Sequence, residues 1–362
     1  MAEGLQVHQF VPVLLPQDAV GNHTLETHRA LAEGGMDPRL WAATVHPQLA
    51  RVGRPYRRFP ATPDRRAGRR VLLYQAASVS GGIVDFLMKR PEPKVINYHN
   101  LTPARFYEPY EPATAAGLVE ASRELRKLAE QVRVAIADSE FNAAELRAMG
   151  VEHVKVVPPY MARGLRVEPD PAALGTLEAS RRGIDLLFVG RIVPNKAHQH
   201  LVRMMAAMRA AIDPGARLQV VGPPGPESYR RVLVGLVERL VPGGVMFTGA
   251  VTDAELAAHY RHADAFVCLS EHEGFGVPLV EAMRAELPIV AYDGGAVGET
   301  LGGTGVLLRT VDPRTVAEVV ARVAGDETLR AQLTRRQLER AAELESFPRD
   351  QAIVRTLLEA EA

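Results

Sequence analysis

Two glutamates stand eight positions apart in the stretch 268-CLSEHEGFGVPLVEAM-283, with a pair of glycines between them. Glu273 directly precedes the glycines, and Glu281 lies in the helical pattern that starts around Pro278. Glycines let bare backbone approach a ligand, and the free N–H groups of a helix start attract anions or sugar hydroxyls. A carboxylate beside such a site is unfavourable unless it accepts hydrogen bonds from neutral hydroxyls. The pattern therefore favours a ligand with both anionic and polyhydroxyl parts, such as a nucleotide sugar.

A second candidate site is the loop 190-GRIVPNK-196, in which Arg191 and Lys196 precede another helical pattern. A helix N-terminus flanked by two cations suits a diphosphate. Only five of the 43 basic residues are lysines, and Lys196 is the only lysine after position 155. An ammonium differs chemically from a guanidinium, so its use here favours a site that requires it. The alternatives are that Lys196 is an ordinary surface residue and that Glu281 is only an acid matched to a helix dipole.

Strands and helices must bring these loops together. Short β-branched runs alternate with amphipathic helical patterns in both halves of the chain, which predicts parallel sheets covered on both faces. We expect an α/β protein of two Rossmann-like doubly wound domains that face each other across a cleft, with ligands at the carboxyl ends of the strands. The predicted strands are 7–15, 71–75, 94–99, 133–138 and 154–158, followed by 184–190, 217–222, 245–249, 265–270, 288–292 and 305–308.

Composition excludes several classes of protein. The formal net charge is zero, which argues against a general nucleic-acid binder. No apolar run reaches the roughly 18–20 residues of a transmembrane helix, and the N-terminus does not resemble a signal peptide. The single cysteine, Cys268, cannot form an internal disulfide and lies in an apolar run, which favours a buried thiol. We therefore expect a cytoplasmic protein.

The segment 51-RVGRPYRRFPATPDRRAGRR-70 contains eight arginines and one acid. It has two interpretations. It is either a solvated basic loop or a patch that contacts anionic lipid headgroups or an anionic acceptor. The second interpretation predicts peripheral contact with the inner face of the plasma membrane.

The chain resembles the family 4 glycosyltransferases, which are retaining enzymes of the GT-B fold. The stretch 273-EGFGVPLVE-281 matches their E-x7-E motif. The resemblance covers nearly the whole chain, and the N-terminal half is similar to a bacterial branch of the family. One departure is the first loop, which reads D-A-V-G-N in place of the common twin-glycine form. Further matching stretches are 189-VGRIVPNK-196, 222-GPPG-225, 247-FTGAV-251, 18-DAVGNHTLE-26, 97-NYHNLTPARFY-107, 137-ADSEFNAAEL-146 and the C-terminal SFPRDQAIVRTLLEA.

The resemblance implies a role for each matching residue of the second half. Arg191 and Lys196 would hold the donor diphosphate and offset charge on the leaving group. Glu273 would hydrogen-bond the transferred sugar, Glu281 would bind the ribose hydroxyls, and Val251 would lie near the base. The backbone next to Glu273 would also bind the donor, through Gly274, Phe275, Gly276 and Val277.

In the first half, the resemblance implies that Gly21 and Asn22 approach the phosphates and the acceptor, and that His99 faces the donor sugar as a catalytic residue. The alternative for His99 is a structural histidine with satisfied hydrogen bonds. The implied domains are an N-terminal acceptor-side domain at 1–165 and a linker at 166–183. A nucleotide-sugar-binding domain at 184–345 and a C-terminal helix at 346–362, packed back on the first domain, would follow.

The expected reaction transfers a hexose from a UDP- or GDP-sugar to an acceptor hydroxyl of a glycan, a lipid-linked sugar or a small molecule. No D-x-D sequence and no metal-ligand spacing occur, so cations and helix dipoles would replace a divalent metal, and no cofactor is expected. As in the family, the acceptor would attack the sugar from the same face from which the leaving group departs. The alternatives are a GT-B-like nucleotide-sugar epimerase, which needs no acceptor, and a non-catalytic nucleotide-sugar-binding protein. An NAD oxidoreductase is disfavoured because no G-x-G-x-x-G follows the first strand.

Overall fold

Two parallel sheets organise the protein, one in each of two units of a computed structural model that describes residues 4–16, 18–60, 69–161 and 167–361. Unit 1 comprises Met1–Arg105, Pro112–Tyr160 and Phe347–Ala362. Unit 2 comprises Phe106–Glu111 and Met161–Ser346. The C-terminal segment Phe347–Ala362 therefore belongs to unit 1, although unit 2 precedes it in the chain. The short segment Phe106–Glu111 belongs to unit 2, although the residues on both sides of it belong to unit 1.

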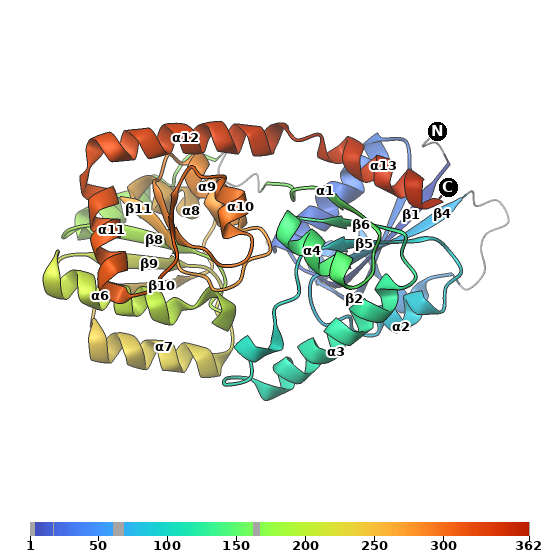
Figure 1. Cartoon of the computed structure of the whole chain (residues 1–362), viewed down its shortest axis with the longest axis horizontal. Coiled ribbons are helices and arrows are strands. Elements are labelled where there is room, and N and C mark those ends of the chain that lie inside the picture. The colour runs from blue at the N-terminus through green and yellow to red at the C-terminus, as the bar shows by residue number, and fades with distance from the viewer. Residues whose placement is uncertain (1–3, 17, 61–68, 162–166, 362) are drawn as a thin grey trace. The chain divides into compact units, whose positions relative to one another are not determined.

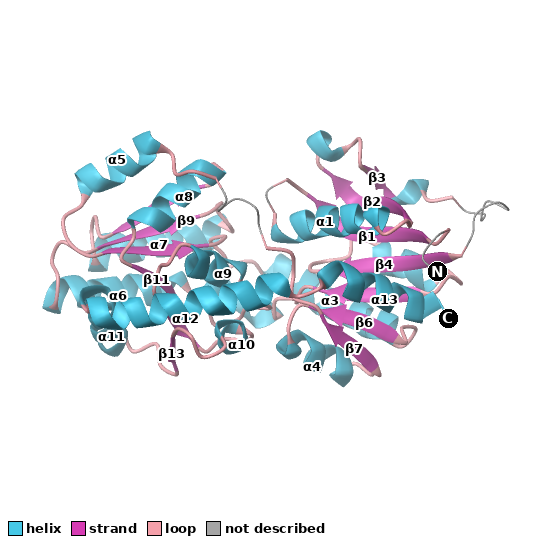
Figure 2. Cartoon of the chain, turned by 90° about the horizontal axis from the view of Figure 1, so that it is seen from above, coloured by secondary structure: helices cyan, strands magenta, loops and turns pink. Residues whose placement is uncertain are grey.

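Unit 1 contains a seven-stranded sheet in the order β3-β2-β1-β4-β5-β6-β7, and all neighbouring strands run parallel. Figure 2 shows the strands fanned in this order. Helices α1 and α13 cover one face and α2 and α3 the other (Figure 1). The strands are β1 (Gln6–Leu14), β2 (Asp37–Val45), β3 (Gly53–Pro55), β4 (Arg70–Ala76), β5 (Lys94–Tyr98), β6 (Val134–Ala137) and β7 (His153–Val156); the helices are α1 (Ala19–Glu33), α2 (Ile83–Met88), α3 (Pro112–Ala129), α4 (Glu140–Ala148) and α13 (Arg349–Glu361).

Unit 2 contains a six-stranded parallel sheet in the order β10-β9-β8-β11-β12-β13. Helices α6 and α7 cover one face, and α8 and α9 cover the other (Figure 1). The strands are β8 (Asp185–Val189), β9 (Arg217–Val221), β10 (Val245–Gly249), β11 (Ala265–Cys268), β12 (Ile289–Tyr292) and β13 (Val306–Leu308); the helices are α5 (Pro171–Ser180), α6 (His198–Ala211), α7 (Glu227–Leu240), α8 (Asp253–His262), α9 (Val277–Arg284), α10 (Val297–Leu301), α11 (Pro313–Gly325) and α12 (Glu327–Ser346).

Each sheet buries apolar side chains on both faces. In unit 2, one continuous core joins strand residues such as Phe188 and Phe266 to helix residues such as Met205 and Val320. Unit 1 has separate clusters on the two faces of its sheet. No helix among the residues that the structure describes is long and apolar enough to cross a membrane. The two sheets agree with the near-continuous apolar runs from which they were predicted.

Three features of the fold differ from the sequence-based expectations. Strands β2 and β3 were not predicted; β2 begins with Asp-Pro-Arg, which is unusual for a strand, and β3 has only three residues. The apolar residues Leu118, Ala121, Leu125, Leu128 and Val132 are spaced as on one helix face and predict a helix that reaches Val132, whereas α3 ends at Ala129 and Val132 is buried in the following turn. The segment expected to be a linker contains α5, which packs against α8 within unit 2. Helix α13 packs against β4, β5 and β6.

Candidate active site

Strands β8 and β11 are hydrogen-bonded neighbours at the centre of the unit 2 sheet. From β8 the chain continues to β9 on one side, and from β11 it continues to β12 on the other. The loops that leave the carboxyl ends of two such strands diverge and leave a crevice, which is where ligands bind in open α/β sheets. The loop after β8 contains Arg191 and Lys196, and the loop after β11 contains Glu273.

Lys196 and Glu273 are in direct contact: the Nζ atom of Lys196 donates a hydrogen bond to Oε2 of Glu273. The Lys196 side chain is 21% exposed and that of Glu273 is 10% exposed. Lys196 ends a short 3-10 helix, Pro194–Lys196, and the next residue, Ala197, has a φ of +50°. Because an ammonium has three N–H donors, this contact leaves donor capacity on Lys196 for a ligand.

Asn195 ties the two loops together through its backbone and its side chain. Its Nδ2 donates to the carbonyl oxygen of His272 at 3.0 Å, and its own carbonyl accepts from the backbone N–H of Glu271 at 3.0 Å. Asn195 is 6% exposed. Asn195 was not predicted from the sequence, although it directly precedes Lys196. Its contacts fix Lys196 and Glu273 on neighbouring loops.

Residues that follow β12 form hydrogen bonds to the loop between Glu273 and α9. The N–H of Ala296 donates to the carbonyl of Glu273 at 2.8 Å, and Oγ1 of Thr300 donates to the carbonyl of Phe275 at 2.6 Å. A Cβ atom at Gly295 would lie 2.4 Å from the carbonyl oxygen of Glu273, so a side chain there would displace the loop. Gly295 and Thr300 thus help to position Glu273, and neither was predicted from the sequence.

Helix α9 begins as the glycine and proline pattern predicted. Gly276 is its N-cap residue with a φ of +94°, and Pro278 lies in its first turn. Gly274, which was expected to share this freedom, does not have a positive φ. Val277 is the first residue of the helix. The N–H groups of this helix start therefore follow Glu273 directly in the chain.

Glu281 lies beyond the first turn of α9 and is 7% exposed, so it is not a surface acid at a helix cap. Its Oε2 accepts a hydrogen bond from the phenol of Tyr260 on α8 at 2.8 Å. Burial raises the pKa of the Glu281 carboxyl, and the Tyr260 bond partly offsets that effect. Burial also raises the pKa of Tyr260 well above its usual value, so the phenol remains a donor.

Arg191 is exposed, and the backbone beside it rests on the 222-GPPG-225 turn. The N–H of Ile192 donates to the carbonyl of Pro223 at 3.1 Å. A Cβ atom at Gly225 would lie 2.0 Å from the carbonyl oxygen of Ile192, so glycine is required there. The positive charge of Arg191 counteracts the burial that raises the pKa of Tyr107 in the segment Phe106–Glu111. Backbone packing thus fixes the position of the loop while the Arg191 side chain reaches solvent.

Two neighbouring groups are kept neutral. Burial and the charge of Lys196 lower the pKa of His198 to about 3. Burial and the charge of Glu273 raise the pKa of Cys268 to about 11, so this buried residue is a thiol and not a nucleophile. Val251 lies between β10 and α8, partly buried against the core. Lys196, Glu273 and Arg191 therefore supply the charge at the ends of β8 and β11.

The remaining predicted residues belong to unit 1. His99 follows β5, and its side chain is 3% exposed. Its Nδ1 is 2.9 Å from Oδ2 of Asp138, and its Nε2 is 2.7 Å from Oε1 of Gln75. His99 therefore has a hydrogen-bond partner at both ring nitrogens, which is the geometry of the structural alternative. Its predicted catalytic role stays a prediction.

Gly21 and Asn22 lie in the first turn of α1. The N–H of Gly21 donates to the side chain of Asp18, the N-cap residue, at 3.0 Å. A Cβ atom at Gly21 would lie 2.4 Å from the carbonyl oxygen of Leu15, so this position requires glycine despite the missing twin glycine. Asn22 is exposed. Among the residues that the structure describes in both units, no group of three or more His, Cys, Asp or Glu side chains could hold a metal ion.

Comparison with known proteins is consistent with this geometry. Residues 177–340 match the family model described as glycosyl transferases group 1. This segment contains the loops after β8 and β11, which form the switch point of the sheet, where the strand order reverses. The chain is 32% identical over 173 residues to a GDP-mannose-dependent alpha-(1-6)-phosphatidylinositol monomannoside mannosyltransferase of Mycobacterium tuberculosis, covering 44% of this chain and 43% of that protein. It is 36% identical over 172 residues to a D-inositol 3-phosphate glycosyltransferase of Kineococcus radiotolerans, covering 43% and 40%. The chain thus matches less than half the length of these relatives.

Solved structures match over nearly the whole chain. Sucrose-phosphate synthase from Thermosynechococcus elongatus has a TM-score of 0.74 at 20% identity, covering 98% of each chain. Anabaena HepE in complex with UDP and glucose has a TM-score of 0.74 at 17% identity, covering 98% and 99%. WaaG, a glycosyltransferase involved in lipopolysaccharide biosynthesis, has a TM-score of 0.69 at 14% identity, covering 96% and 98%. The chain therefore has the GT-B fold of two Rossmann-like α/β units.

Proposed function

We propose that this protein is a retaining glycosyltransferase of family 4 that moves a hexose from a UDP- or GDP-sugar to an acceptor hydroxyl without a divalent metal. The observation that carries the proposal is the contact between Lys196 and Glu273 at the switch point of unit 2. It places a cation suited to a diphosphate beside a carboxylate suited to sugar hydroxyls. The match of residues 177–340 to a glycosyltransferase model supports the same conclusion.

Donor binding would engage both cations. The N–H groups of Lys196 that Glu273 does not use, together with the guanidinium of Arg191, would hold the diphosphate and offset the charge that builds on the leaving group. Glu273 would then accept hydrogen bonds from the sugar hydroxyls. The N–H groups at the start of α9, from Gly276, would add the positive end of a helix dipole. Glu281 would bind the ribose, with Tyr260 orienting its carboxylate.

The transfer step needs no further catalytic base. The acceptor oxygen bonds to the anomeric carbon on the face from which the nucleoside diphosphate leaves. The bond between that carbon and the phosphate oxygen breaks, and the same phosphate oxygen takes the acceptor's proton. We assign Gly21 to donor binding, through its approach to the phosphates, and Asn22 and His99 to the acceptor side of this reaction. The acceptor class includes lipid-linked sugars, since one relative's name specifies a phosphatidylinositol monomannoside.

A cytoplasmic location with peripheral membrane contact would suit a lipid-linked acceptor. In the segment 51–70, six arginines are described: Arg51, Arg54, Arg57, Arg58 and Arg69 are exposed and Arg70 is half-buried, whereas Arg65 and Arg66 lie outside the described residues. Exposed arginines at this density attract anionic headgroups. Membrane contact is therefore part of the proposal for this segment.

A nucleotide panel followed by an activity assay tests the proposed function. Thermal unfolding is measured with UDP, GDP, ADP and their sugars, and we expect a uridine or guanosine diphosphate sugar to stabilise the protein. The best donor is then incubated with EDTA and with lipid, glycan or inositol acceptors, and the anomeric configuration of the product is read by NMR. A product of inverted configuration contradicts retention, and loss of turnover with EDTA contradicts metal independence. Conversion of UDP-GlcNAc without any acceptor would instead indicate an epimerase.

A further inference from the structure

A cavity in unit 1 lies apart from the proposed transfer site of unit 2 and includes two arginines of the segment 51–70. Its volume is about 250 Å³, and it lies between the first half of β2, the turn into β3 and helix α1. Figure 2 shows α1 beside the β1–β2–β3 edge of the sheet, and α1 packs against β1 and β2. The polar and aromatic side chains that line the cavity are His28, Arg39, Trp41, Arg51 and Arg54.

The cavity is on the amino-terminal side of the sheet. The lining residues of β2, Pro38 to Trp41, belong to the first five of its nine residues, and Trp41 pairs with Arg54 of β3. Helix α1 starts at the carboxyl edge of β1 and runs back, so His28 in its second half lies towards the amino ends. Gly21, at the start of the same helix, lies at the opposite edge. The cavity is therefore separate from the edge of the sheet where donor and acceptor are expected.

Positive charge around this cavity exceeds negative charge. Arg39 forms an ion pair with Asp37 at 3.0 Å, and Asp37 also accepts from Gln6 at 3.1 Å. Arg51 and Arg54 form no ion pair with any residue in the described ranges 4–16, 18–60, 69–161 and 167–361. Three guanidinium groups thus surround one hollow with a single carboxylate nearby. Guanidinium forks match the oxygens of phosphate, and like charges gathered in a concave site favour an anion.

His28 adds a neutral donor to this group. Burial, and then the charge of Arg39, lower the pKa of His28, while Asp37 raises it. The Nδ1 of His28 is buried and has no hydrogen-bond partner in the described part of the chain, so Nε2 is the ring nitrogen left to face a ligand. The indole N–H of Trp41 is already used, because it donates to Nδ1 of His8 at 3.0 Å. Trp41 therefore acts as a rigid wall of the cavity.

We propose that this cavity is a binding site for a phosphate group, held by Arg39, Arg51 and Arg54 with His28 as a neutral hydrogen-bond donor. The site is distinct from the proposed transfer site of unit 2 and does not depend on that function. The shared chemistry is a phosphate with free oxygens, which either a soluble phosphate compound or a phospholipid headgroup supplies. A site for either one would give unit 1 a phosphate contact of its own, in addition to the donor site proposed for unit 2.

The intrinsic fluorescence of the full chain tests this site, because Trp41 is the only tryptophan in the sequence. The protein is titrated with inorganic phosphate at constant ionic strength set by chloride. We expect a saturable change, and Arg51→Ser/Arg54→Ser should weaken the affinity at least roughly tenfold because two charge-assisted contacts are lost. The matched control is Arg126→Ser/Arg133→Ser, which removes the same charge from exposed positions of unit 1 outside the cavity and should keep the affinity of the unmodified protein. Calorimetry repeats the titration without relying on the indole.

Vesicles identify the source of the phosphate. Cosedimentation with phosphatidylcholine vesicles is compared with and without phosphatidylglycerol, for the unmodified protein and both double variants. Binding of inorganic phosphate without vesicle binding assigns the site to soluble phosphate compounds. Vesicle binding that only Arg51→Ser/Arg54→Ser abolishes assigns it to headgroups. If neither probe binds, or if both double variants lose binding equally, the cavity is not a phosphate site. Equal thermal midpoints of the three proteins show that they are folded.

Discussion

Strands β8 and β11 have charged side chains at both ends, and the two ends use charge in different ways. At the amino end, Asp185 accepts two hydrogen bonds from Arg217, each at 2.8 Å, and contacts Nε2 of His262 at 2.9 Å. At the carboxyl end, Lys196 and Glu273 meet through a single contact. Asp185 at the amino end is fully hydrogen-bonded by its neighbours, whereas Lys196 at the carboxyl end still has N–H groups that can bind a ligand.

Burial follows the same difference. The Asp185 side chain is 1% exposed and that of His262 is 2% exposed, whereas Lys196 is 21% exposed. Closed, buried ion clusters are costly to break but offer nothing to a ligand. The half-open pair at the carboxyl end can exchange part of its hydrogen bonding for a substrate. Within one sheet, therefore, unsatisfied bonding capacity, more than charge, distinguishes the candidate site from the structural cluster.

Breaking the buried cluster should produce the largest effect. Arg217→Ala removes both guanidinium bonds and leaves the Asp185 carboxylate with His262 as its main partner. We expect a loss of about 3–5 kcal/mol in the free energy of unfolding, as for other buried pairs that lose one partner. Urea denaturation measures it. Donor affinity of the folded fraction should be unchanged, and a loss of donor affinity without a loss of stability would reverse the roles assigned to the two ends.

The opposite result is expected at the carboxyl end. Lys196→Ala should reduce turnover at least roughly tenfold, equivalent to about 1.4 kcal/mol of transition-state stabilisation, because the leaving diphosphate loses its ammonium. Its thermal midpoint should change far less than that of Arg217→Ala. Release of nucleoside diphosphate from the donor measures turnover, and Lys155→Ala in unit 1 is the control, since it also removes a lysine from an ion pair.

Turnover of Lys196→Ala equal to that of the unmodified protein would remove the assignment of Lys196. A double variant, Lys196→Ala/Glu273→Gln, separates two causes of a loss. In the single variant, Glu273 loses the partner of its buried charge, and the double variant removes that charge as well. If turnover returns in the double variant, the ammonium serves only to neutralise Glu273 and does not stabilise the leaving group.

Tyr260→Phe tests the predicted ribose contact through its pH dependence. An ionised Glu281 would accept hydrogen bonds from the ribose hydroxyls. Affinity for the nucleotide-sugar donor should therefore be present above the pKa of Glu281 and be lost as the pH falls through it. Burial already raises this pKa, and the Tyr260 bond lowers it. Removing the phenol should therefore raise this pKa further and move the loss of affinity to higher pH. Calorimetric titrations at several pH values measure the midpoint, with Tyr74→Phe, a buried tyrosine of unit 1, as control. A midpoint that stays or falls contradicts the contact.

The sequence predicted the strands and loops of this site but not its internal contacts. The apolar runs before Arg191 and Glu273 mark buried parallel strands, and Gly276 and Pro278 mark the start of α9, because these signals are local in the chain. The contact between Lys196 and Glu273 joins residues 77 positions apart and depends on β8 lying beside β11. Strand order is a property of the folded sheet, and no local pattern encodes it.

The supporting residues were missed for the same reason. Asn195 bridges to the carbonyl of His272, and Tyr260 reaches Glu281 from another helix. An asparagine or a tyrosine in the sequence has many possible partners, so its type alone does not identify the one it takes. Gly295 needs close backbone packing, which becomes visible only when the neighbouring loop is placed beside it. The charged and glycine residues of the site were thus predictable, and the residues that hold them were not.

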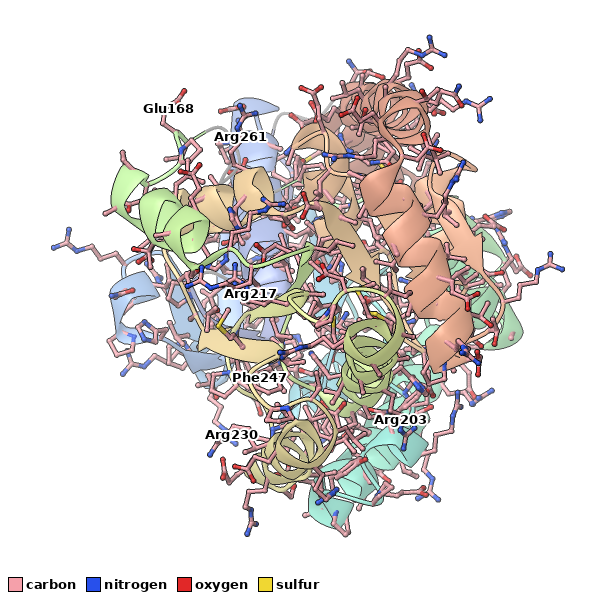
Figure 3. All side chains as sticks on the ribbon, turned by 90° about the vertical axis from the view of Figure 1, so that its left-hand side faces the viewer. Glu168, Arg203, Arg217, Arg230, Phe247 and Arg261 are labelled. Atoms are coloured by element: carbon pink, nitrogen blue, oxygen red, sulfur yellow. The ribbon has the colours of Figure 1, made fainter. Side chains whose placement is uncertain are left out.

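The smallest effect is expected from Arg230→Ala, which tests whether burial causes the large loss of stability expected for Arg217→Ala. Arg230 on α7 binds Glu227 with the same two-bond geometry that Arg217 uses on Asp185, at 2.7 and 2.9 Å (both arginines are labelled in Figure 3). This pair is exposed, so solvent and salt screen the attraction and side-chain entropy opposes it. We expect no measurable change in the urea midpoint at 0.15 M salt. A loss comparable to that of Arg217→Ala would mean that hydrogen-bond geometry, and not desolvation, sets the strength of the cluster at Asp185.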